Sequence, residues 1–159
     1  MWRRARPDED DRLVEMCKSL YAEDPGPHPV TIEQAHRTLA TLRREPWRGR
    51  AVVLDVDGQL VGYALLISFW SNELGGEVCD VDELFVAREH RGRGHATALF
   101  QALEHDALWP ASAVALALGT TPGNANARRL YERLGFAEVG VSMVRRRALD
   151  SSRHTEEDA

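Results

Sequence analysis

Cysteine is scarce in this sequence, and long apolar runs are missing from it. The two cysteines, Cys17 and Cys79, match neither a disulfide framework nor a cysteine-based zinc site. Residues 1–7 include three arginines, but no apolar segment follows them as it would in a secretion signal, and no later run is long enough to span a bilayer. We therefore expect two reduced thiols, a cytoplasmic location and no membrane partner.

Neither sign of charge dominates the composition. The chain has 20 Lys and Arg residues against 25 Asp and Glu residues, a formal net charge of -5 at pH 7. That balance argues against general nucleic-acid binding and is compatible with cationic substrates. The basic triplet at residues 145–147 has no interleaved aromatic residues, so we interpret it as the exposed end of an edge strand. No nucleic-acid partner is expected.

Three widespread catalytic motifs are also missing. The six histidines have no acidic or thiol neighbours at metal-ligand spacing, so no metal site is expected. The sequence has no Gly-x-Ser-x-Gly segment, which argues against a serine hydrolase. It has no Gly-Lys-Ser or Gly-Lys-Thr ending to a glycine-rich loop either, which argues against nucleotide hydrolysis.

Residues 80–97 form the most informative stretch of the chain. The segment 78–86 is rich in apolar and β-branched side chains, which is typical of a strand. After residue 94, apolar side chains recur at the spacing of one helical face, at Ala96, Leu99, Phe100, Leu103 and Ala107. The stretch therefore predicts a strand, a loop and a helix in that order.

The loop in this stretch is suited to a phosphate or pyrophosphate. The first backbone N–H groups of a helix have no intrahelical partner, and the helix dipole is positive there. Gly92 and Gly94 allow close approach and positive φ, and Arg91 and Arg93 add positive charge. A dinucleotide fingerprint needs a third small residue where Thr97 stands, so a dinucleotide is disfavoured.

The remaining patterns predict one compact domain over residues 1–149 and a polar, disordered tail over residues 150–159. Two helices come first; Asp8 is expected to cap the first, and Thr31 with Gln34 forms a capping box for the second. An antiparallel hairpin turns at residues 57–58, and Asn124 is placed to cap a later helix that ends at Gly135. Further strands are expected over residues 2–6, 51–57, 59–70, 112–118 and 139–149.

Two segments carry a family resemblance. The loop Arg91-Gly92-Arg93-Gly94-His95-Ala96 resembles the Arg/Gln-x-x-Gly-x-Gly/Ala loop of GNAT superfamily N-acetyltransferases, and Asp82-Glu83-Leu84-Phe85-Val86 is similar to their fourth strand. Downstream, Asn124-x-x-Ala127-x-x-Leu130-Tyr131-Glu132-Arg133-Leu134-Gly135-Phe136 is similar to the family's Asn-x-x-Ala-x-x-Leu-Tyr-Glu-Lys-x-Gly-Phe segment. The resemblance extends to about residue 144. It implies a mixed α/β (α+β) fold whose mostly antiparallel sheet of six to seven strands is flanked by about four helices and splayed at the CoA site.

The resemblance also implies acetyl-CoA as the co-substrate. The pantetheine arm would lie along the strand backbone like an added strand, and the pyrophosphate would bind the amides of the glycine-rich loop. The implied cofactor-binding residues are Leu84, Phe85, Val86, Arg91, Gly92, Arg93, Gly94, His95, Ala96, Thr97, Asn124 and Tyr131.

The implied reaction is direct transfer of an acetyl group to a primary amine, of a small molecule rather than a protein. The amine must lose a proton before it attacks, so a carboxylate is expected as the base: Asp82 first, Glu83 next and Asp80 third. A regular strand would separate Asp82 from Glu83, whereas a bulge, which the family has, would shift the alternation. Tyr131 matches the family's tyrosine beside the thioester sulfur, which can protonate the departing thiolate.

Acceptor-contacting residues are expected on three segments. Tyr21 lies at the end of the first expected helix, Trp70 and Glu73 lie at and after the end of the hairpin, and Asp82 lies on the strand before the glycine-rich loop. Phe69 and Trp70 are adjacent on a strand, so one is expected at the acceptor rim and the other in the core. Protein lysine or N-terminal acetylation, a non-catalytic acyl-CoA-binding regulatory role and a homodimer all stay open.

Overall fold

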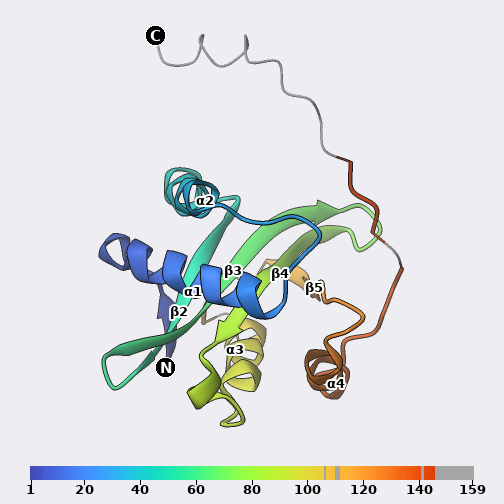
Figure 1. Cartoon of the computed structure of the whole chain (residues 1–159). Helices are drawn as coiled ribbons and strands as arrows, with labels where there is room; N and C mark the ends of the chain where they lie inside the picture. Colours follow the sequence, from blue (N-terminus) through green and yellow to red (C-terminus); the bar gives the residue numbers. More distant parts are fainter. Residues whose placement is uncertain (106, 110–111, 141, 146–159) are drawn as a thin grey trace, which may run out of the picture.

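A five-stranded mixed sheet forms the middle of the molecule in the computed structural model, which describes residues 1–105, 107–109, 112–140 and 142–145 (Figure 1). The strands β1 (Trp2–Arg4), β2 (Gly49–Val56), β3 (Gln59–Ser71) and β4 (Gly76–Val86) pair antiparallel in chain order. β5 (Ala113–Leu118) pairs parallel with β4. The mixed, mostly antiparallel architecture confirms the prediction. The six to seven expected strands are too many, because the described residues form five.

Four α-helices of the described residues cover the two faces of the sheet (Figure 1). On one face lie α1 (Asp10–Glu23) and α2 (Ile32–Arg44), which share a core cluster with β2 and β3. On the other lies α3 (His95–Glu104), and the last helix, α4 (Ala125–Arg133), packs its Tyr131 against the α3 cluster. The expected helical face ran on to Ala107, but α3 ends at Glu104.

Period-two alternation along β2 divides the core between these two layers. Val52 and Leu54 face α3, whereas Val53 between them faces α1 and α2. Each is essentially inaccessible to solvent, and full burial of such a side chain contributes about 1.5–3 kcal/mol. A shift of one residue in the pairing of β2 would exchange the two sets, so the pattern fixes the register.

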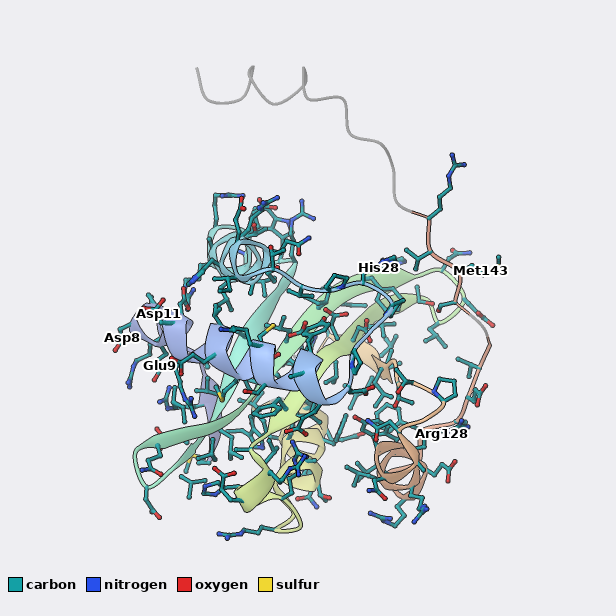
Figure 2. All side chains as sticks on the ribbon, viewed as in Figure 1. Asp8, Glu9, Asp11, His28, Arg128 and Met143 are labelled. Carbon is teal, nitrogen blue, oxygen red and sulfur yellow. The ribbon has the colours of Figure 1, made fainter. Side chains whose placement is uncertain are left out.

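The first helix starts later than expected. Asp8 lies exposed in a 3-10 turn, η1 (Pro7–Glu9), and α1 begins at Asp10 (Figure 2). Glu9 occupies the N-cap position of α1 but makes no side-chain hydrogen bond to the helix; its carboxylate instead accepts the Arg6 N–H at 2.7 Å and the Arg3 guanidinium at 2.7 Å. The prediction of Asp8 as the N-cap is therefore wrong.

Three other predictions of local structure are confirmed: a capping box, a hairpin turn and a glycine after a helix. Thr31 accepts the Gln34 N–H at 3.1 Å while the Gln34 side chain accepts the Thr31 N–H at 2.8 Å, which is the predicted capping box. Asp57 and Gly58 have φ values of 53° and 82°, as a tight hairpin turn requires. Gly135, with φ of 88°, follows α4.

Two predictions near the edges of the fold are wrong in their described parts. The last strand, expected over residues 139–149, is absent from residues 139–140 and 142–145, where Val139 and Met143 are 96% and 94% exposed (Figure 2). Residues 141 and 146–149, like the expected tail at 150–159, lie outside the described residues. Phe69 and Trp70 are both exposed, at 47% and 72%, because β3 and β4 run on past the covering helices (Figure 1). Neither belongs to the core.

Candidate active site

A β-bulge in β4 brings two acidic residues to one face of the sheet. Leu65 of β3 pairs with Glu83, but the next residue, Leu66, pairs with Val81, so Asp82 is left without a partner across β3. On a regular strand, adjacent side chains point to opposite faces. The extra residue interrupts that alternation, and both Asp82 and Glu83 line a single pocket.

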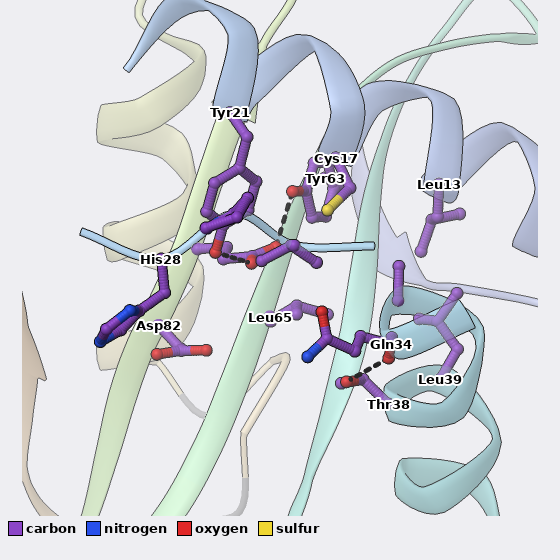
Figure 3. A pocket seen from close by; sticks show the side chains of 14 residues that line it. Leu13, Cys17, Tyr21, His28, Gln34, Thr38, Leu39, Tyr63, Leu65 and Asp82 are labelled. Atoms are coloured by element: carbon purple, nitrogen blue, oxygen red, sulfur yellow. Dashed lines mark hydrogen bonds between the residues drawn. The ribbon is translucent and has the colours of Figure 1, made fainter. Parts of the chain in front are cut away.

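This pocket has a volume of about 240 Å³ and lies between the sheet and the first two helices (Figure 3). Asp82 and Glu83 of β4 and Tyr63 of β3 form its polar floor, and Tyr21 reaches it from α1. The aliphatic side chains that line it are Leu13, Val30, Ala35, Leu39 and Leu65. Such a mixture suits a ligand with one charged end and an apolar body.

Two phenols hold the Glu83 carboxylate in a fixed position. Tyr21 donates to Oε1 and Tyr63 donates to Oε2, each at 2.7 Å (Figure 3). Burial raises the pKa of Glu83, while these two hydrogen bonds act to lower it. Burial and the nearby carboxylate raise the pKa of both phenols, so they remain neutral donors. Glu83 is thus a positioned anion whose hydrogen-bonding capacity is partly used.

Asp82 is arranged differently. Its side chain accepts no hydrogen bond from the part of the chain that the structure describes, and solvent reaches it at the pocket. The protein around it still removes enough water to raise its pKa. Asp80, before the bulge, also has a raised pKa, from burial and then from the charge of Asp82, but it is not among the lining residues. Asp82 is therefore the carboxylate most available to take a proton.

β4 loses its second neighbour where the bulge begins. The ladder between β4 and β5 ends with Val81 opposite Leu118, so residues 83–86 pair with β3 alone among the described strands. The unpaired edge includes Leu84, Phe85 and Val86. Backbone groups on such an edge are available to an extended ligand.

The glycine-rich loop connects this edge to α3. Gly92 and Gly94 have φ values of 73° and 79°, and Gly94 is the N-cap residue of the helix that begins at His95. A side-chain carbon placed at either glycine would meet no atom within 4 Å. Ala96 and Thr97 follow in the first turn, where backbone N–H groups lack intrahelical partners. The loop therefore presents open space and backbone donors together.

The two arginines of the glycine-rich loop, Arg91 and Arg93, make different contacts. Arg91 donates to the Val86 carbonyl at 2.7 Å, pairs with Glu23 at 2.7 Å and lies over the Phe85 ring. Its guanidinium thus ties the loop to β4 and α1 instead of standing free beside an anion site, as its sequence position had suggested. Arg93 is exposed and donates to the Glu89 carbonyl at 3.1 Å.

The start of α4 is tied to the end of α1. Asn124 accepts the Ala127 N–H at 3.2 Å, which confirms it as the cap, and its amide donates to Asp24 at 3.2 Å. Tyr131 on this helix lies edge-on to Phe100 and Phe136, with ring centroids at 5.9 and 6.0 Å. Burial, and then the charge of Asp24, raise the pKa of Tyr131. Its phenol stays protonated at neutral pH.

The structure brings some of the expected acceptor residues together and leaves others apart. Tyr21, Asp82 and Glu83 line one pocket. Trp70 is the last residue but one of β3 and Glu73 lies in the turn that follows, and neither lines that pocket. Sequence reasoning missed Tyr63, which is 1% exposed. Tyr63 lies two residues before Leu65 on β3, so both side chains point to the same face of the sheet. This spacing was the signal in the sequence that could have placed Tyr63 in the pocket.

Comparison with known proteins identifies the chain. The acetyltransferase (GNAT) family model matches residues 13–136. This chain belongs to the GNAT family. It is similar to an uncharacterized N-acetyltransferase of Methanocaldococcus jannaschii, with 38% identity over 91 residues that make up 56% of this chain and 39% of that protein. The chain thus spans well under half of that relative.

Solved structures share this fold. A possible acetyltransferase from Clostridium difficile 630 superposes with a TM-score of 0.78 at 21% identity, covering 94% of this chain and 98% of that one. An aminoglycoside N-acetyltransferase in complex with CoA gives a TM-score of 0.74 at 19% identity, covering 94% of this GNAT chain and 95% of that one. No helix among the described residues is long and apolar enough to cross a membrane. The same part of the chain contains no group of His, Cys, Asp and Glu residues that could hold a metal ion.

The phenol of Tyr63 offers a test of how Glu83 is held. Tyr63→Phe keeps the ring but removes a hydrogen bond to a carboxylate, so the free energy of unfolding at neutral pH should fall by about 1.5–3 kcal/mol. The bond favours ionised Glu83, whose pKa should rise further in the variant. The difference in unfolding free energy between wild type and variant should therefore be largest above the pKa of Glu83 and should shrink as the pH falls through that pKa. Chemical denaturation at two pH values measures this, and equal deficits would contradict it.

Proposed function

We propose that this GNAT protein transfers an acetyl group from acetyl-CoA to a primary amine by direct attack. The observation that carries the proposal is the bulge in β4. The bulge directs Asp82 and Glu83 into one pocket, and the pairing of β4 with β5 ends at Val81, the residue directly before Asp82. A proton acceptor therefore lies next to the edge along which the acetyl donor would bind.

Acetyl-CoA would use backbone groups for most of its contacts. The pantetheine arm lies along Leu84, Phe85 and Val86 as an added strand, and the pyrophosphate binds the amides of the loop and of the first helical turn. The positive φ of Gly92 and Gly94 and the open space beside them support this placement. The CoA complex of the aminoglycoside N-acetyltransferase, which shares the fold, supports CoA as the ligand class.

The reaction follows from the charges in the pocket. The acceptor enters as an ammonium ion and is held near Glu83, and its proton passes to Asp82, directly or through water. The neutral nitrogen attacks the thioester carbonyl and a C–N bond forms, after which the nitrogen releases its second proton to solvent and the C–S bond breaks. Tyr131 gives its proton to the departing thiolate, and the phenol is restored from solvent.

Thermal denaturation and thiol release test the proposal together. Saturating CoA or acetyl-CoA should stabilise the fold, by about 2.7 kcal/mol at a hundred times Kd, whereas ATP and NAD should not. Acetyl-CoA with a primary amine should release free thiol. Stabilisation without release, for small amines and peptides alike, would favour the regulatory acyl-CoA-binding role. Release with peptides or proteins but not with small amines would favour a protein acetyltransferase.

Replacement of Tyr131 with Phe separates its proposed role from packing. The ring contacts with Phe100 and Phe136 need no hydroxyl, so the melting temperature, with and without acetyl-CoA, should stay close to that of the wild type. Turnover should fall at least about tenfold, a barrier increase of roughly 1.4 kcal/mol. Steady-state kinetics with several amines measures this. An unchanged kcat would leave Tyr131 as a packing residue.

A further inference from the structure

The pocket beside Asp82 and Glu83 carries charge of one sign. Its lining residues include these two carboxylates but no lysine or arginine, and exposed His28 is the one basic side chain among them (Figure 3). On the neighbouring loop, Arg91 is already paired with Glu23 at 2.7 Å. A cation entering the pocket therefore meets two anions, and an anion entering it meets no strong positive charge.

The wall formed by α2 is polar but neutral. Gln34 and Thr38 face the pocket from this helix, across from Asp82 (Figure 3). The side-chain oxygen of Gln34 already accepts a hydrogen bond from the Thr31 N–H. The Thr38 hydroxyl donates to the backbone carbonyl of Gln34 at 3.0 Å. These groups can hydrogen-bond a neutral ligand atom, but they supply no charge to compensate a carboxylate.

The size of the pocket limits the acceptor as well. The pocket volume is about 240 Å³. That is smaller than the roughly 300–1,000 Å³ of pockets for drug-sized ligands. The apolar walls from Leu13, Leu39 and Leu65 favour a hydrocarbon body of modest length. A large polycationic acceptor would leave most of its charges outside.

We propose that this pocket selects compact primary amines that carry no carboxylate, and so discriminates against free α-amino acids. The inference rests on the proposed acetyl transfer to an amine. The carboxylate of an amino acid lies two bonds from its amine nitrogen, so it would enter the pocket beside Asp82 and Glu83. Like charges brought together without compensation are strongly disfavoured. An amine or an amino-acid amide with the same side chain avoids that contact.

Matched triplets of acceptors test this selection. One triplet is isopentylamine, leucine and leucinamide, and a second is phenethylamine, phenylalanine and phenylalaninamide. In each, thiol release from acetyl-CoA should give a kcat/KM for the amine and the amide at least about tenfold above that for the amino acid. The amide controls for bulk at the α-carbon, so a low value for the amino acid alone identifies the charge as the cause.

A positive charge placed on α2 should weaken or remove the preference for the amide over the amino acid. Thr38→Arg puts a guanidinium in the pocket wall at a partly exposed helical position, and the kcat/KM ratio of amide to amino acid should fall by about tenfold or more. The matched control is His36→Arg, on the same helix but outside the pocket lining and beside Asp11 at 3.8 Å. The control should keep the wild-type ratio.

The outcomes separate this inference from the function on which it rests. Amino acids used as well as their amides, or equal ratios in Thr38→Arg and His36→Arg, would overturn the selection while leaving amine acetylation intact. Thiol release with none of the six compounds, despite stabilisation by acetyl-CoA, would overturn the assignment of the pocket to small amines and the selection with it.

Discussion

Asp82→Asn is expected to lower turnover by about 10²–10⁴-fold at pH values below the pKa of the acceptor amine. In that range the amine arrives protonated, and asparagine cannot accept its proton. The wild-type carboxylate has a raised pKa and accepts no hydrogen bond from the described residues, so it is both basic and available. At higher pH the free amine is abundant, and the variant should approach the wild-type rate.

A pH–rate profile of kcat measures this effect. Wild-type activity should be lost as the pH falls through the raised pKa of Asp82, since the base is then protonated. Asp80→Asn is the matched control, because Asp80 lies just before the bulge with a raised pKa but outside the pocket lining. Glu83→Gln should cost less than Asp82→Asn. A reversed order would make Glu83 the base, and unchanged profiles for both would mean that solvent deprotonates the amine.

Features encoded by a few adjacent residues could be predicted from the sequence. The turn at Asp57 and Gly58, the capping box of Thr31 and Gln34 and the cap at Asn124 are all present, because each depends on side chains within three residues of the backbone group they satisfy. The strand, loop and helix of residues 80–97 follow from the same kind of local signal. Asp8 was misassigned because Pro7–Glu9 form a separate 3-10 turn, which places Glu9 instead of Asp8 directly before the first residue of α1.

Features that depend on pairing between distant segments could not be predicted. Glu83 is bound by Tyr21 and Tyr63, which are 62 and 20 residues away in the chain. Whether Asp82 shares its face depended on the register of β3 against β4, which no single strand reveals. Trp70 and Glu73 were expected at the acceptor because of their place in the chain, but the length of the β3–β4 hairpin carries them past the pocket.

The bulge links the two halves of the proposed site. Asp82 directly follows Val81, the last β4 residue paired with β5. The bulge that directs two carboxylates to the proposed acceptor pocket therefore lies where the edge proposed for the pantetheine arm begins. Removing the bulge by deleting one residue would restore alternation and send one carboxylate to the opposite face. The proposed base and the proposed donor edge thus lie next to each other on β4.

Gly94→Val is expected to abolish the stabilisation by acetyl-CoA, about 2.7 kcal/mol or roughly 5–10 °C in melting temperature at a hundred times Kd. Valine disfavours the φ of 79° at this position, and its side chain would occupy the open space beside the loop amides. Gly58→Val is the matched control, because Gly58 has a φ of 82° and equally open surroundings in the distant β2–β3 turn. Both variants should lose intrinsic stability through backbone strain, but only Gly58→Val should keep the full shift with acetyl-CoA. Equal shifts in the two variants would show that the cofactor does not bind against this loop.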